Sequence, residues 1–192
     1  CYSLPAHSFP SARGMGEPLA GRLTTPDGTS FVGALAGNDE DFVVLATESG
    51  YGFIAQISEL YSKNKAGKAV ISARGNISVI PPALIQDPVK DSIACVTNEG
   101  YLLIFKAKDL PTLARGKGLK MQQIPAPKLK SKEEFMCAIV ALGADDSLRV
   151  LAGSRHVTLK PKDLKRYRAG RARRGLKLPR GFQKVDGIEA CE

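Results

Sequence analysis

Basic residues that stand beside glycine are the part of this sequence whose chemistry is easiest to infer. Three such clusters, NKAGK, ARGKG and RARRG, occupy residues 64–68, 114–118 and 171–175. Glycine lets the main chain approach a phosphate and offer its N–H groups. Arginine in such a loop binds phosphate oxygens through two N–H donors. The clusters therefore indicate contact with a polyanion through its phosphate groups.

The positive charge of the chain is concentrated in one segment. The formal net charge of the 192 residues is +9, and residues 155–184 hold twelve Lys or Arg residues against one acid. In the preceding part of the chain, bases follow Leu60 and Leu110, whereas acids stand at 38–41, 87–91 and 144–146. If equivalent loops lie on one rim, this order gives one basic and one acidic edge. A continuous basic edge is typical of proteins that bind a nucleic-acid backbone.

Thirteen bases are the candidates for these phosphate contacts, and backbone contacts of this kind carry no base information. They are Lys63, Lys65, Lys68, Arg115, Lys117, Lys120, Arg166, Arg168, Arg171, Arg173, Arg174, Lys177 and Arg180. The alternative, that any one of these bases is only a solvated loop residue, is outweighed by their recurrence at one repeat position. Tyr167, within KRYRAGR, is a further candidate for contact with a sugar or phosphate.

A repeat places these bases. Residues 50–68 and 100–118 both begin with Gly-Tyr, carry Leu ten positions after that glycine, and end in a glycine-bearing basic cluster. A third copy runs through 157–164, and FPSARGMG at 9–16 resembles the end of a preceding copy. We therefore expect a remnant at roughly 1–35 and three units at 36–86, 87–142 and 143–192, within one domain that covers 1–192.

Each unit is predicted to be a set of short strands. Apolar stretches bounded by Gly, Asn, Asp or Pro occupy 42–47, 52–57, 68–73 and 77–82 in one unit. The next unit has 92–97, 101–107, 120–124 and 136–142, with single helical turns expected at 58–60 and 108–111. Four strands in about 50 residues, repeated, predict an all-β, propeller-like disc. In this scheme Tyr51 and Tyr101 pack at strand starts.

The remaining residues favour no catalytic or metal site. His7 and His156 have no ligand partners at metal spacing, and Asp145 with Asp146 suits a turn. The stretch SKEE at 131–134 is interpreted as a polar connection between strands. No G-x-x-x-x-G-K-[ST] loop is present, and no apolar run reaches the roughly 18 residues of a membrane span. Four scattered cysteines favour a reduced, cytoplasmic protein. We expect no cofactor, no metal and no membrane partner.

The three segments at 50–70, 100–118 and 171–189 together resemble the C-terminal domains of bacterial topoisomerase IV A subunits. The likeness covers essentially the whole chain and rests on the Gly-Tyr starts, the spacing, the basic glycine loops and the closing Arg-Gly segment. It implies a β-pinwheel, a propeller-like disc whose blades exchange strands with their neighbours. Here the disc would be partial, with about three complete blades and a remnant. Its basic rim would bind and bend duplex DNA without sequence specificity.

The resemblance also implies what the chain does not do alone. The catalytic tyrosine of this family belongs to an N-terminal region, and the ATPase belongs to the B subunit. We therefore expect no enzyme activity from this segment, but a role in an ATP-dependent type II topoisomerase of the bacterial cytoplasm, associated with the nucleoid. Its partners in decatenation, relaxation and chromosome segregation would be the ATPase B subunit together with a second A subunit.

Two alternatives stay open at this point. One is the DNA-wrapping C-terminal domain of the gyrase A subunit, whose Gln-Arg-Arg-Gly-Gly-Lys-Gly box has only partial counterparts here, at 114–118 and 171–175. The other is a propeller-type module for protein partners, which would bind with little dependence on salt. The sorting of charges favours DNA over the second.

Overall fold

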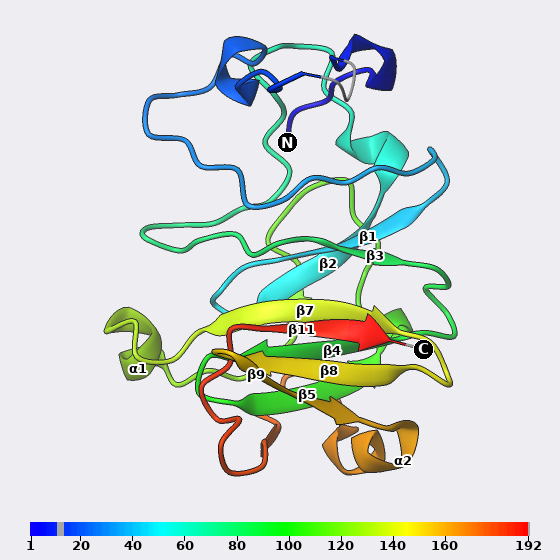
Figure 1. Cartoon of the computed structure of the whole chain (residues 1–192), viewed down its shortest axis with the longest axis vertical. Coiled ribbons are helices and arrows are strands. Elements are labelled where there is room, and N and C mark those ends of the chain that lie inside the picture. The colour runs from blue at the N-terminus through cyan, green and yellow to red at the C-terminus, as the bar shows by residue number, and fades with distance from the viewer. Residues whose placement is uncertain (11–13, 192) are drawn as a thin grey trace.

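The structure is a computed structural model that describes residues 1–10 and 14–191. Three residues of the predicted remnant motif at 9–16 therefore lie outside the described part. The chain is mostly β-structure with short helical turns, which confirms the all-β prediction (Figure 1). The strands are β1 (Phe42–Ala46), β2 (Tyr51–Gln56), β3 (Ala83–Ile85), β4 (Ser92–Thr97), β5 (Tyr101–Lys106), β6 (Leu119–Lys120), β7 (Met136–Leu142), β8 (Ser147–Ala152), β9 (Arg155–Leu159), β10 (Leu176–Lys177) and β11 (Gly187–Cys191).

The helical elements are all short. The 3-10 turns are η1 (Ala6–Ser8), η2 (Leu19–Gly21), η3 (Ile57–Leu60), η4 (Ala107–Asp109) and η5 (Lys165–Tyr167), and the α-helices are α1 (Ala126–Lys130) and α2 (Pro161–Leu164). The turns η3 and η4 directly follow β2 and β5, as predicted from SEL and KDLP. The helix α1 was not predicted.

Three antiparallel sheets carry the fold, and successive sheets exchange strands. Their strand orders are β3-β1-β2-β6, β10-β5-β4-β7 and β11-β8-β9. Although β6 follows β5 in the chain, it pairs with β2 of the first sheet, and β10 pairs with β5 of the second sheet after following β9. This exchange is the arrangement that distinguishes a pinwheel. Among the described residues, β9 has no such partner on its outer side.

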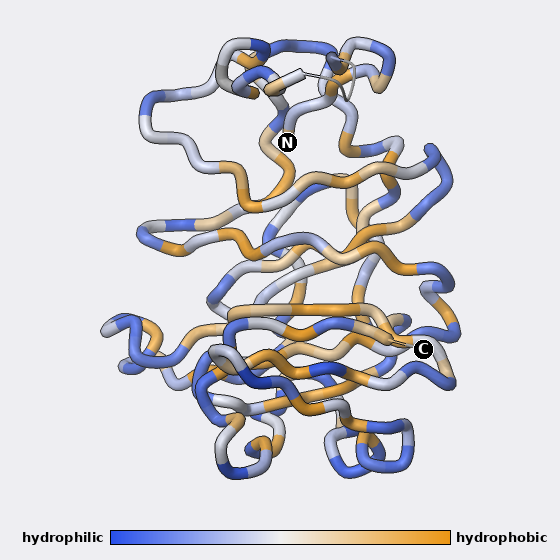
Figure 2. The backbone as a smooth tube through the Cα atoms, in the orientation of Figure 1, coloured by the Kyte–Doolittle hydropathy of each residue, from blue (hydrophilic) through white to orange (hydrophobic). Residues whose placement is uncertain are grey.

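The core lies between the sheets. Along β4, Ile93 and Cys95 belong to a cluster shared with the first sheet, whereas Ala94 and Val96 belong to a cluster shared with the third. Every residue of β4 is buried, since both faces of the second sheet are covered. Figure 2 shows apolar residues along the stacked strands and polar residues in many of the outer loops. The strands β3, β7 and β11 approach one another at the opposite edge of the sheets from β6 and β10.

An aspartate closes the turn before the first strand of each sheet. The carboxylate of Asp41 accepts the Asn38 N–H at 2.7 Å, and that of Asp91 accepts the Asp87 N–H at 3.0 Å. Asp146 accepts the Gly143 N–H at 2.8 Å. The acids that precede each unit's first strand therefore include a structural turn residue, which confirms the turn predicted for the third of them.

Two of the strand predictions were wrong. Residues 68–73 contribute an isolated bridge at Ile71, and the main chain of Lys68 pairs with Cys1 through hydrogen bonds of 2.8 and 2.9 Å. Residues 77–82 contribute an isolated bridge at Val79. The ladder resumes at β3, beyond Pro81 and Pro82, because proline has no N–H to donate. The strand predicted at 120–124 is limited to β6.

Candidate nucleic-acid interface

The exchanged strands β6 and β10 place basic residues on the outer edge of the preceding sheet. In the first sheet, Lys120 of β6 stands opposite Tyr51 of β2. In the second sheet, Lys177 of β10 stands opposite Tyr101 of β5 in the same register. Each exchanged strand follows a glycine with positive φ, +72° at Gly118 and +90° at Gly175. A methyl group there would lie 2.0 Å and 2.3 Å from a carbonyl oxygen of the neighbouring strand, so only glycine permits this close pairing.

The first junction consists of Tyr51, Lys117 and Lys120. The Nζ atom of Lys117 lies 3.8 Å from the centre of the Tyr51 ring, and that of Lys120 lies 5.5 Å from it. Both ammonium groups therefore face the negative π surface of the ring. Lys120 also donates to Gln123 Oε1 at 3.1 Å. In the part of the chain that the structure describes, neither lysine forms an ion pair with a carboxylate.

The second junction consists of Tyr101, Arg174 and Lys177, and it repeats the first with one base changed. The Cζ atom of Arg174 lies 3.9 Å from the centre of the Tyr101 ring, and Lys177 Nζ lies 5.3 Å from it. Arg174 occupies the position of Lys117, because each stands directly before the positive-φ glycine. The two junctions thus share a tyrosine ring and, beside it, two bases that are three residues apart in the sequence.

The second junction also contains a buried acid. Glu134 is completely buried, and its Oε2 lies 2.6 Å from Arg174 Nη2. Its Oε1 accepts a second, longer bond of 3.3 Å from Arg174 Nε, and Lys128 Nζ lies 3.7 Å from Oε2. This two-pronged contact is the strong form of an arginine–carboxylate pair. The stretch SKEE is the polar connection before β7 that was predicted, and its last residue also enters the interior and binds Arg174.

The basic loops of successive units lie side by side. Gly116 N donates to Val70 O at 2.8 Å, and Ser72 N donates to Gly116 O at 2.8 Å. One unit further on, Ala172 N donates to Met121 O at 2.8 Å and Gln123 N donates to Arg173 O at 2.9 Å. We name the bases on these segments the cationic band, and they are Arg115, Lys117, Lys120, Arg171, Arg173, Arg174 and Lys177.

Three of the arginines among the predicted contact residues form hydrogen bonds within the protein. Arg174 binds Glu134, Arg171 Nη1 donates to Lys120 O at 2.5 Å, and Arg168 Nη1 donates to Ser92 Oγ at 2.9 Å. Arg168 is nevertheless largely exposed. Such bonds use part of the hydrogen-bonding capacity of these guanidinium groups before any ligand arrives.

The other candidates extend from the band to both sides. Lys63 and Lys65 are exposed in the loop that precedes Lys68, whose Nζ donates to Glu59 O at 2.6 Å. Arg166 is exposed beside Tyr167, with its Cζ 5.2 Å from that ring centre. Arg180 is exposed in the turn after β10.

The structure confirms the interpretation of two tyrosines and contradicts that of a third. Tyr51 and Tyr101 do stand at strand starts, but their rings also carry the paired bases of the next unit. The recurring tetrapeptides KGLK (117–120) and RGLK (174–177) were the signal that could have revealed this. Tyr167 is 2% exposed and packs in the core between the second and third sheets. It is therefore not available for the sugar or phosphate contact considered for it.

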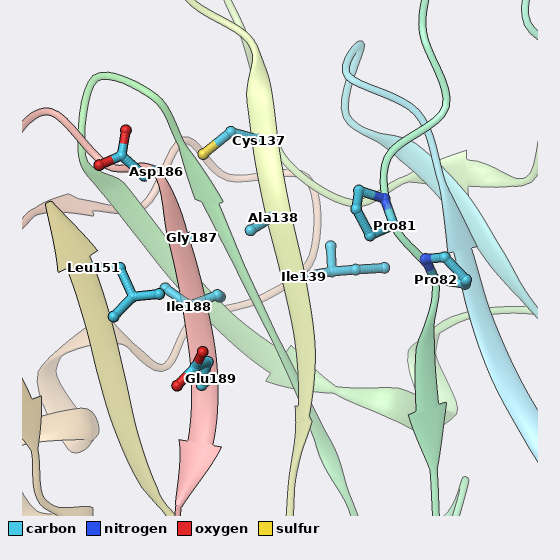
Figure 3. Close-up of a pocket in the computed structure, with 10 residues that line it drawn as sticks. All are labelled: Pro81, Pro82, Cys137, Ala138, Ile139, Leu151, Asp186, Gly187, Ile188 and Glu189. Atoms are coloured by element: carbon cyan, nitrogen blue, oxygen red, sulfur yellow. The ribbon is translucent and has the colours of Figure 1, made fainter. Parts of the chain in front are cut away.

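A cleft of about 330 Å³ lies on the other side of the sheets, near β7 and β11. Figure 3 shows Pro81 and Pro82 on one side of it and Cys137, Asp186 and Glu189 among the residues on the other. Burial raises the pKa of the Cys137 thiol to about 12, so this sulfur is protonated at neutral pH and is a poor nucleophile. The charged residues that line the cleft are acidic, so it is unsuited to phosphate.

Within residues 1–10 and 14–191, no group of three or more His, Cys, Asp or Glu side chains is arranged to hold a metal ion. No helix of that same described part is long and apolar enough to cross a membrane.

Comparison with known proteins gives a consistent set of similarities. Residues 41–78 and 91–136 match the family model of the DNA gyrase C-terminal domain, β-propeller. Over 187 residues, 97% of this chain, the sequence is 49% identical to the A subunit of DNA topoisomerase 4 from Pseudomonas aeruginosa. The same protein of Escherichia coli is 36% identical over 188 residues. The chain spans about a quarter of the length of these relatives, 25% in both cases.

Solved structures agree with the sequence comparisons. The structure of the E. coli ParC C-terminal domain superposes with a TM-score of 0.85 at 36% identity, over 99% of this chain and 76% of that one. The DNA gyrase A C-terminal domain superposes with a TM-score of 0.73 over 92% of this chain and 58% of that one. Its identity is 14%, so this second likeness concerns the fold alone.

Proposed function

Because the chain belongs to the family of C-terminal domains of type IIA topoisomerase A subunits, with the topoisomerase IV protein as its matched relative, we propose that it binds duplex DNA along the cationic band. The observation that carries the proposal is the exchange of β6 and β10, which joins the basic loops of successive units along one edge. A duplex presents a regular series of phosphates. A series of bases fixed on stacked sheets suits that target better than a compact anion.

Binding of this kind is independent of base sequence and strongly dependent on salt. Lysine and arginine that neutralise phosphates release counterions, and the logarithm of affinity falls by about 0.9 per phosphate for each unit of log salt. If the thirteen candidates neutralise about eight phosphates, the slope is near −7. The test is a fluorescence titration of the chain with unrelated duplexes of equal length across a salt series. Affinity that is insensitive to salt, or that follows base sequence, would refute the proposal.

We further propose that the duplex bends as it follows the band from one sheet to the next. Bending a short site costs on the order of 1 to 6 kcal/mol, which added phosphate contacts offset. A duplex labelled with a fluorophore at each end should show increased energy transfer when the chain binds. Unchanged transfer at saturating protein would rule out bending while leaving binding intact.

In the whole protein, the bent segment would be presented to the catalytic core of an ATP-dependent type II topoisomerase. Its partners would be the ATPase B subunit together with a second A subunit, and its place the bacterial cytoplasm beside the nucleoid. Decatenation and relaxation would serve chromosome segregation. We propose that residues 1–192 form one DNA-binding domain within this assembly, without strand-cleaving activity or a cofactor of its own. Incubation of the chain with supercoiled plasmid should leave the plasmid intact and its linking number unchanged.

A further inference from the structure

We propose that Glu134 competes with DNA phosphate for Arg174, and that it thereby makes the second junction a weaker DNA contact than the first. This inference rests on the proposed function and assigns Glu134 as a residue that sets the strength of one part of the interface. The two junctions share their geometry, and they differ in the buried carboxylate that contacts Arg174.

The competition follows from the atoms that Glu134 engages. Its two carboxylate oxygens contact Nη2 and Nε of Arg174, at 2.6 and 3.3 Å. Those two nitrogens form one of the edges through which a guanidinium binds two oxygens of a phosphate. A phosphate at that edge would have to displace a carboxylate that is completely buried, and the displaced charge would lose its partner in a medium that solvates it poorly.

The ring of Tyr101 restricts Arg174 further. The guanidinium carbon lies 3.9 Å from the ring centre, so one face of the planar group is covered. The main chain is also fixed, because the buried amide of Gln122 donates to both Tyr101 O and Arg174 O at 2.8 Å. Arg174 is therefore held from three directions, and its Nη1 group is the part that these contacts do not engage.

Among residues 1–10 and 14–191, the first junction has no equivalent acid. Thr47 pairs with Val79 as Thr97 pairs with Met136, so Ile77 occupies the position that Glu134 occupies one unit later. At the second junction Glu134 pairs with one of the two bases, Arg174, and has Lys128 Nζ 3.7 Å from the same oxygen, whereas no carboxylate of the described residues pairs with Lys117 or Lys120 at the first. Lys117 is exposed, and its ammonium group can turn to a phosphate without separating an ion pair.

The decisive variant is Glu134→Gln, which keeps the shape and a hydrogen-bond acceptor for Arg174 but removes the competing charge. The 192-residue chain and a short fluorescein-labelled duplex suffice. At about 100 mM salt we expect tighter binding, by roughly threefold to tenfold, and a salt slope steeper by about 0.9. Glu133→Gln is the matched control, because it changes the net charge equally on an exposed neighbour, and we expect it to alter the affinity less than twofold.

The double variant Glu134→Gln/Arg174→Gln tests whether the gain passes through Arg174. It leaves the net charge unchanged and replaces an ion pair by a pair of amides. We expect its affinity and slope to match those of the unmodified chain. Lys117→Gln, in contrast, should reduce the steepness of the slope by about 0.9. These two variants decide the proposal even if Glu134→Gln does not fold.

The outcomes separate this inference from the proposed function. If the unmodified chain binds duplex with a steep salt dependence but Glu134→Gln leaves affinity and slope unchanged, Glu134 is not a competitor. The same conclusion follows if the double variant loses as much slope as Lys117→Gln. If the unmodified chain does not bind duplex at all, the proposed function itself fails, and this inference fails with it.

Discussion

The two junctions are built alike and carry different charge. Tyr51 and Tyr101 occupy the same place in their strands, and each receives two bases three residues apart from the next unit. Only the second junction contains Glu134, which comes from the segment before β7 rather than from the repeated strands. The repeat thus fixes where these bases lie, and under our proposal the connecting segment sets how much of their charge a duplex can reach.

The strand exchange should be equally indispensable at both junctions. Gly118→Ala and Gly175→Ala place a methyl group within 2.0 and 2.3 Å of a carbonyl oxygen and impose a positive φ on alanine. We expect each to lower the free energy of unfolding by about 3 kcal/mol, from backbone strain and the clash together. Urea unfolding measures this. Gly153→Ala, at φ +60° in open space, should cost only about 1 kcal/mol. If one of these alanine variants is as stable as the unmodified chain, the strand pairing at that junction does not contribute to stability as the structure indicates.

Removal of the base that stands directly before the glycine should lower the free energy of unfolding by different amounts at the two junctions. Arg174→Ala leaves the buried carboxylate of Glu134 with Lys128, 3.7 Å away, as its one ion-pair partner among the described residues. We expect a loss of about 2 kcal/mol in the free energy of unfolding, less than for a fully buried pair because Arg174 is partly exposed. Lys117→Ala should cost less than about 0.5 kcal/mol. Addition of Glu134→Gln to Arg174→Ala should recover part of the loss, and a double variant as unstable as the single one would contradict the buried ion pair as its cause.

Charge reversal of both lysines at the first junction should weaken duplex binding strongly. Lys117→Glu with Lys120→Glu removes two phosphate contacts and adds two repulsive charges. We expect the affinity to fall roughly thirtyfold at about 100 mM salt. The slope of log affinity against log salt should become less steep by about 1.8. Lys106→Glu with Lys108→Glu makes the same charge change on exposed residues at the other end of β5. An equal loss in that control would show that net charge, not the band, determines binding.

The ring of Tyr51 should contribute less to duplex affinity than the two lysines do. Tyr51→Leu removes the π surface beneath Lys117, and we expect the duplex affinity to fall about threefold, the size of a solvent-exposed cation–π contact. Tyr51→Phe keeps that surface and should bind DNA as the unmodified chain does. Tyr61→Leu is the matched control, because Tyr61 is exposed and bonds Asp39 at 2.8 Å rather than a base. A loss with Tyr51→Phe equal to that with Tyr51→Leu would exclude the ring as the cause.

Much of the architecture could be predicted because it is local. The stretches at 42–47, 92–97, 101–107 and 136–142 are apolar runs bounded by turn residues, and they became β1, β4, β5 and β7. The stretches at 68–73 and 77–82 look similar in composition but form only isolated bridges. Whether these stretches form strands depends on which segments lie beside them and on the two prolines that follow Ile80. Composition alone predicts neither effect.

The site could be predicted only as a set of bases. The repeat placed bases in equivalent loops, and the exchange of β6 and β10 sets those loops along one edge. The engagement of single side chains was out of reach, since Glu134 and Arg174 are 40 positions apart and Arg171 and Lys120 are 51 positions apart. Contacts between such distant residues follow from the packing of the sheets and leave no local pattern.

The most direct test of the account is a footprint of the duplex on the lysines of the chain. Acetylation followed by mass spectrometry, with and without bound DNA, reports which ammonium groups the duplex covers. We expect strong protection at Lys117 and Lys120, protection at Lys177, and none at Lys106 and Lys108. Protection confined to Lys106 and Lys108, or spread evenly over all lysines, would contradict binding along the exchanged strands.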